Sequence, residues 1–119
     1  MFSYFHVQGQ SMEPFCREGD FVLVNRMSYL LSHPCVGDVV VFSDPARKDF
    51  LLVKRVARIS RGGLVWVEGD NTQGSYDSRT FGWIPRKAIL GKGKVIHRSL
   101  PLAYDIMTQS LERSLINKV

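Results

Sequence analysis

Short runs of apolar residues, each closed by glycine, aspartate or proline, dominate the first 97 positions of the chain. Runs of about four to eight apolar or alternating residues between such turn residues are typical of β-strands. The strands expected from this pattern lie at 5–7, 21–24, 39–42, 50–59, 64–67 and 89–97. Arg61-Gly62-Gly63 has the composition of a hairpin turn. Many short strands at this spacing predict a mostly β, compact, barrel-like core.

The pattern changes toward the C-terminus. Apolar residues there recur at roughly helical spacing with polar residues between them, namely Leu102, Ile106, Leu111 and Leu115. This periodicity predicts a C-terminal amphipathic helix. A single helical turn is also expected at 85–88, after the proline. The expected organisation is therefore one β domain at 1–99 and a helix within 100–119 that packs on it or flanks it.

Bulk composition narrows the classes of function. The chain has 119 residues, which suits one domain, and a formal charge of +5. Its basic residues are spread along the sequence and are not interleaved with aromatic residues, so nucleic acid is not an expected partner. No segment resembles a signal peptide, and no stretch reaches the ~20 apolar residues of a membrane span. The expected location is cytoplasmic or peripheral to a membrane.

The two cysteines, Cys16 and Cys35, do not form a C-x-x-C pair. Two partly buried free thiols are therefore favoured. A disulfide between them, or a metal site that also uses His33, remains an alternative.

The strand at 50–59 carries two cations, Lys54 and Arg55, among apolar neighbours. Side chains alternate between the faces of a strand, so Leu52, Lys54 and Val56 share one face and Arg55 lies on the other. One interpretation is that these side chains extend to water or pair with carboxylates. The other is that Lys54 is desolvated, which would lower its pKa and make it a general base at neutral pH.

A general base needs a nucleophile, and Ser11 is the candidate. Gly9 allows a sharp turn before it and Pro14 stiffens the chain after it. A second dense group of polar residues follows the strand at 64–67, in the loop 69–82. This loop contains carboxylates, hydroxyls and an arginine, which suggests a connection that holds a defined shape.

These motifs occur in a characteristic order: Gly9-Gln10-Ser11-Met12-Glu13-Pro14, Gly19-Asp20, Gly37-Asp38-Val39-Val40, Val53-Lys54-Arg55-Val56, Gly69-Asp70-Asn71, Ser75-Tyr76-Asp77-Ser78-Arg79 and Gly82. In this combination the chain resembles the type I signal peptidases, from Gly9 to about Gly91. The resemblance implies a signal-peptidase-like β core, similar also to the C-terminal domains of SOS-type repressors. It implies a serine endopeptidase without a metal or cofactor. The implied substrate is a polypeptide with an extended leader or propeptide.

The resemblance also implies roles for individual residues. Ser11 matches the nucleophile and Lys54 the general base of a Ser/Lys dyad. Ser75 matches the serine that orients the lysine amine. Supporting positions are matched by Asp77, Arg79 and Arg55, and oxyanion or substrate-pocket positions by Gly9, Met12 and Val53. Relatives often have a serine where Gly9 stands, so the second donor of the oxyanion hole is not identified by the motif.

Short members of this kind without a membrane anchor resemble maturation proteases, including those that trim the propeptide of nickel-type superoxide dismutase. Basic residues near the expected C-terminal helix would suit peripheral contact with a membrane. Two other functions compete with leader or propeptide removal. One is a self-cleaving SOS-type regulator with the same dyad, and the other is a non-catalytic β-barrel that binds peptides.

Overall fold

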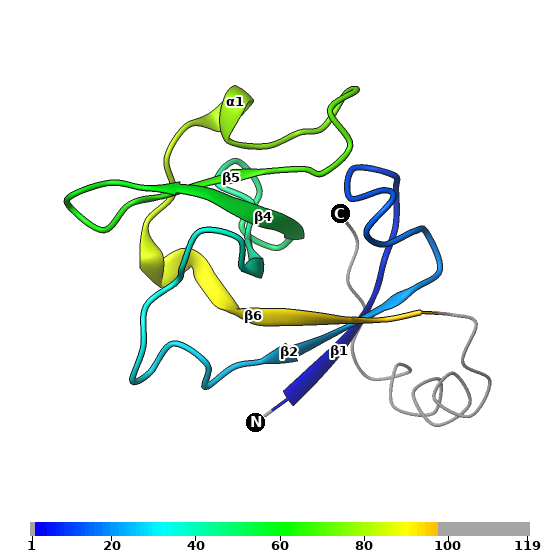
Figure 1. The fold of residues 1–119 in the computed structure, drawn as a ribbon, viewed down its shortest axis with the longest axis horizontal. Coiled ribbons are helices and arrows are strands. Elements are labelled where there is room, and N and C mark those ends of the chain that lie inside the picture. The colour runs from blue at the N-terminus through cyan, green and yellow to red at the C-terminus, as the bar shows by residue number, and fades with distance from the viewer. Residues whose placement is uncertain (1, 98–119) are drawn as a thin grey trace.

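The computed structural model describes residues 2–97, which form a mostly β fold (Figure 1). The elements in chain order are β1 (Phe2–His6), β2 (Phe21–Asn25), β3 (Val39–Ser43), β4 (Leu51–Ile59), β5 (Val65–Glu68), α1 (Ser78–Phe81), the 3₁₀ turn η1 (Arg86–Ala88) and β6 (Ile89–Ile96). The amphipathic helix expected within 100–119 lies outside the described residues. Among residues 2–97, no helix has the length and apolar character needed to cross a membrane.

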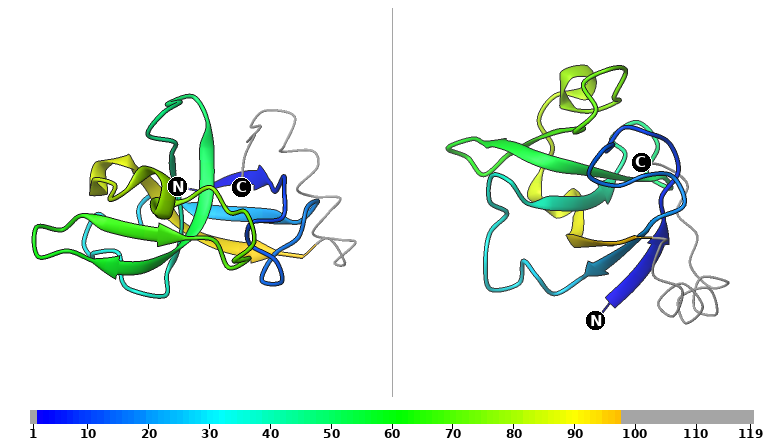
Figure 2. Two further views of the ribbon diagram at one scale, coloured as in Figure 1. Left: turned by 90° about the horizontal axis from the view of Figure 1, so that it is seen from above. Right: turned by 45° about the vertical axis from the view of Figure 1, so that its right-hand side comes forward.

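The six strands form one antiparallel sheet in the order β1-β2-β6-β3-β4-β5. β6 therefore lies between β2 and β3, although it is the last of these strands in the sequence. The β4–β5 hairpin extends away from the β1–β2 end of the sheet in each view (Figures 1 and 2). The sheet is an open, curled form of the barrel-like core expected from the sequence, because β1 and β5 are not paired with each other.

The strand predictions agree with the structure except at one place. The first strand was expected at 5–7 but spans Phe2–His6, because its register with β2 pairs Phe2 with Asn25 and His6 with Phe21. The loop 69–82, for which the sequence predicted a defined shape without naming an element, contains the one-turn helix α1. The Asp77 side chain accepts a hydrogen bond from the Arg79 N–H and so caps this turn.

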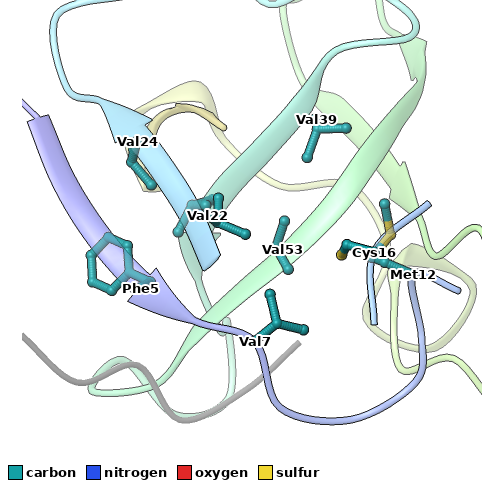
Figure 3. Packing of buried hydrophobic residues seen from close by; sticks show 9 residues of the cluster. Phe5, Val7, Met12, Cys16, Val22, Val24, Val39 and Val53 are labelled. Carbon is teal, nitrogen blue, oxygen red and sulfur yellow. The ribbon is translucent and has the colours of Figure 1, made fainter. Parts of the chain in front are cut away.

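The hydrophobic core has two main clusters that share β3. Because side chains alternate between the two faces of β3, Val39 and Val41 lie in one cluster, whereas Val40 and Phe42 lie in the other. Figure 3 shows the first cluster, in which strand residues pack with Met12 and Cys16 from the turn after β1. That turn is therefore part of the folded core and not a loose surface loop.

Both cysteines are free thiols. Cys16 is buried in the first cluster, whereas Cys35 is exposed and so differs from the partly buried thiol that the sequence suggested. Burial raises the pKa of Cys16 to about 12, which keeps the thiol neutral at ordinary pH.

Candidate active site

The segment between β1 and β2, residues 8–19, forms a closed turn that presents Ser11; we call it the Ser11 turn. Its base is fixed by the hydrogen bonds of the Val7 N–H to the Asp20 carbonyl, 2.9 Å, and of the Gly19 N–H to the Val7 carbonyl, 3.1 Å. Gly9 has a φ of +89°, in the region that favours glycine, which allows the sharp bend just before Ser11.

Two buried side chains hold the Ser11 turn against the core. Met12 and Cys16 lie one turn apart and are joined by a hydrogen bond from the Cys16 N–H to the Met12 carbonyl, 3.0 Å. Both side chains are buried in the first hydrophobic cluster, together with Val53 of β4 (Figure 3). Ser11 is itself half-buried, so its hydroxyl lies at the boundary between core and solvent.

Lys54 of β4 reaches Ser11 from the other side. Its side chain is fully buried, and Nζ lies 2.6 Å from the Ser11 Oγ. Burial lowers the pKa of Lys54 from 10.5 to about 8, although the negative charge of Asp77 opposes part of this effect. An amine with this pKa is neutral in about a tenth of the molecules at pH 7, far more than an ordinary lysine. The pair can therefore exchange a proton directly.

The loop 69–77 lies beside the Ser11 turn, as the green and blue segments at the upper right of Figure 1 show. Asp77 holds the loop in place: its buried carboxylate accepts hydrogen bonds from the Gly69 N–H, 2.8 Å, and from the Arg79 guanidinium, 2.6 and 3.0 Å. Burial alone would raise the pKa of Asp77, but these hydrogen bonds lower it to about 2. Asp77 therefore remains ionised, with Arg79 as its counter-charge.

Arg55 connects three parts of the site. Its guanidinium makes a two-pronged ion pair with Asp70, 2.9 and 2.8 Å, and donates to the Gly37 carbonyl. It also lies over the Phe15 ring of the Ser11 turn, 4.6 Å from the centroid. The hydrogen bonds to Asp70 raise the pKa of Arg55, which keeps it charged.

The loop also binds the Ser11 turn directly. The Asn71 N–H donates to the Ser11 carbonyl, 2.8 Å, and the Asn71 side-chain amide donates to the Gln10 carbonyl, 3.0 Å. Gly69 makes this close approach feasible, because a Cβ at that position would lie 2.7 Å from the Ser11 carbonyl oxygen and 2.1 Å from the Ser75 Oγ. A side chain at 69 would force the two segments apart.

The structure thus brings most of the predicted site residues together, with differences in detail. Ser75 is adjacent to Gly69, but its buried hydroxyl makes no hydrogen bond within residues 2–97. The Ser75 hydroxyl therefore does not bond Lys54 in this conformation. The Gly9 N–H donates to the Glu18 carboxylate, 3.1 Å. Met12 and Val53 are core residues here, so a pocket-lining role for them stays a prediction.

Sequence reasoning did not assign roles to Asp70, Asn71 or Glu18, whose partners lie far away along the chain. The only signal was that Asp70 and Asn71 adjoin Gly69 in one motif, which does not reveal what they bind. In the described part of the chain, no group of three or more His, Cys, Asp or Glu side chains is arranged to hold a metal ion.

Comparisons with known proteins give consistent results. The family described as "Signal peptidase, peptidase S26" matches residues 1–63 and 59–98. Signal peptidase I of Aquifex aeolicus is 46% identical over 57 residues, which are 48% of this chain and 22% of that protein. Mitochondrial ATP-independent inner membrane protease subunit 1a of Arabidopsis thaliana is 30% identical over 83% of this chain and 71% of its own length. The human mitochondrial inner membrane protease subunit 1 is also 30% identical, over 80% and 68%.

Proposed function

Since the chain belongs to the signal peptidase family, peptidase S26, and is therefore a peptidase, we propose that it is a serine endopeptidase with a Ser11/Lys54 dyad. It would remove an N-terminal leader or propeptide from a protein substrate. The observation that carries the proposal is the 2.6 Å contact between Ser11 Oγ and a fully buried lysine amine. A buried lysine paired only for stability would instead be expected to contact a carboxylate.

The reaction begins when neutral Lys54 accepts the proton of the Ser11 hydroxyl. The Ser11 Oγ attacks the scissile carbonyl and forms a C–O bond, and Lys54 then gives the proton to the leaving amine as the C–N bond breaks. Water, activated by the same amine, hydrolyses the acyl-enzyme and restores both residues. Burial is essential to this proposal, because it lowers the pKa of Lys54 to about 8.

The negative charge that develops on the carbonyl oxygen needs a hydrogen-bond donor. The Ser11 N–H is the proposed donor, because it makes no hydrogen bond within residues 2–97. Gly9 offers no hydroxyl, and its own N–H is already donated to Glu18. Asp77 and Arg79 are proposed to hold the loop 69–77 against the dyad, and Ser75 to orient the Lys54 amine during the reaction.

The substrate is proposed to bind as an extended chain along an edge of the sheet, where backbone hydrogen bonds are available. A location at the periphery of a membrane would suit a leader-removing peptidase of this family, whose relatives include the inner membrane proteases named above. A maturation protease that trims the propeptide of nickel-type superoxide dismutase would use the same dyad. The leader accepted in a cleavage assay would distinguish these substrates.

The test is cleavage of leader-bearing proteins by the purified chain, with the new N-terminus identified by mass spectrometry. Ser11→Ala and Lys54→Ala should each abolish cleavage while retaining the β-rich circular dichroism spectrum. Ser3→Ala and Lys94→Ala are matched controls outside the site and should retain activity. Full activity in either dyad variant would refute the proposed mechanism.

A further inference from the structure

Asn71 donates both its backbone N–H and its side-chain amide to the Ser11 turn, although no motif gives it a role in the reaction. Its N–H and its side-chain amide donate to the carbonyls of Ser11 and Gln10, 2.8 and 3.0 Å away. Its Oδ1 accepts the Gln73 N–H, 3.1 Å, which fixes the orientation of the amide group. Asn71 is half-buried between the loop 69–77 and the Ser11 turn.

The two carbonyls that Asn71 binds lie on either side of Ser11 in the backbone. Gln10 contributes the carbonyl of the peptide group that carries the Ser11 N–H, and this peptide bond is trans, because the one cis bond within residues 2–97 joins Glu13 and Pro14. In a planar trans peptide, the C=O and N–H point in opposite directions. A donor that holds the Gln10 carbonyl therefore also fixes the direction of the Ser11 N–H.

The second hydrogen bond restrains the peptide group after Ser11 in the same way. Together the two bonds oppose rotation about both backbone dihedrals of Ser11. The contact from the Asp70 N–H to the Met12 Sδ, 3.4 Å, adds a weaker restraint one residue further along the turn. Within the Ser11 turn, the Glu13 N–H also donates to the Gln10 carbonyl, 3.2 Å. Among described residues outside the turn, Asn71 alone binds the Gln10 or Ser11 carbonyl.

We propose that Asn71 is a positioning residue that aims the Ser11 N–H at the oxyanion by holding the peptide groups on both sides of Ser11. This inference rests on the proposed function. The requirement is strong in this chain because Gly9 has no hydroxyl and its N–H is donated to Glu18. A hole that depends on one backbone donor is sensitive to the direction of that donor.

Two variants separate this role from a general structural one. Asn71→Ala removes the side-chain donor, and Asn71→Asp keeps the size and the Oδ1 acceptor but places a carboxylate against the Gln10 carbonyl. Gln73→Ala is the matched control, because its exposed side chain makes no contact that the site uses. We expect kcat to fall roughly 10- to 100-fold in both Asn71 variants. KM should stay within about twofold, and the pH midpoint set by Lys54 should not move.

A second measurement does not depend on activity. Backbone ¹⁵N relaxation should show a lower order parameter for the Ser11 amide in Asn71→Ala than in Gln73→Ala, with β4 unchanged. An active wild type with unchanged kcat in Asn71→Ala, or with a change in KM alone, would overturn the positioning role but leave the dyad intact. A wild type that cleaves no leader-bearing substrate, although the Ser11 amide does respond, would overturn the proposed function and with it the catalytic purpose of Asn71.

Discussion

Replacing Lys54 by methionine should make the protein more stable while it abolishes the proposed activity. Methionine has a similar length and is apolar, so it fits the buried path that the lysine stem occupies. The half-buried Ser11 hydroxyl, which loses its partner, can still bond water. The remaining difference in stability between the wild type and Lys54→Met is the free-energy cost of holding an ammonium group in a fully buried position.

The size of the effect follows from the pKa of Lys54, which falls from 10.5 to about 8 on folding. At about 1.36 kcal/mol for each pH unit, the ammonium destabilises the folded state by about 3 kcal/mol. This penalty is fully present below pH 8, where both states are protonated. Between pH 8 and 10.5 the unfolded chain binds more protons than the folded one, so the wild-type free energy of unfolding rises with pH.

Urea denaturation of the wild type and of Lys54→Met at several pH values tests this reasoning. The variant should exceed the wild type by about 3 kcal/mol at pH 7, and the difference should shrink to about 1 kcal/mol at pH 9.5. Lys94→Met, at an exposed position of β6, should show no such pH-dependent gain. A difference below about 1 kcal/mol at pH 7, or one that stays constant with pH, would refute the buried-ammonium argument.

Three further predictions concern the same site. The kcat/KM for leader cleavage should rise with pH through a midpoint near 8, as Lys54 loses its proton, and a pH-independent rate between 6 and 9 would contradict this. Gly69→Ala should lower the free energy of unfolding by roughly 1–3 kcal/mol and remove most of the activity, because its Cβ would lie 2.1 Å from the Ser75 Oγ. In the control Gly62→Ala the nearest atom would be 3.9 Å from the new Cβ, so its stability in thermal unfolding should be within about 0.5 kcal/mol of wild type. Asp77→Asn should lower the free energy of unfolding by about 1–3 kcal/mol at pH 7. This difference from wild type should fade as the pH drops from 3.8 toward 2, because the wild-type carboxylate also becomes neutral. If the variant were still less stable by the same amount at pH 2, the ion pair with Arg79 would not be the cause of the difference.

The strands could be predicted because their signal is local. An apolar run such as 39–42 lies between two turn signals, and its alternation supplies both core clusters. The first strand was misplaced because Phe2 and Ser3 become a strand through pairing with β2, which the local pattern does not encode. The helix α1 was missed because its four residues, Ser78–Phe81, are too few to show a helical repeat of apolar positions.

The site was predictable as a set of residues but not as an arrangement. Lys54 was conspicuous because a cation on an apolar strand face needs an explanation, but its separation of 43 positions from Ser11 hid the contact between them. The partners of Arg55 and Asn71 depend on how the loop 69–77 meets the Ser11 turn. Sequence reasoning assigned Ser75 to the lysine amine, whereas in this conformation its hydroxyl lies against Gly69.

The central position of β6 has a consequence for the order of events during synthesis. β6 is the last described strand to leave the ribosome, and it pairs with β2 on one side and β3 on the other. Until it is inserted, the hairpin β1–β2, which carries Ser11, has no strand that joins it to β4, which carries Lys54. A nascent chain without β6 would therefore lack the strand pairing that joins the Ser11 side of the sheet to β3 and β4. We expect the proposed peptidase activity to appear only after β6 has joined the two halves of the sheet.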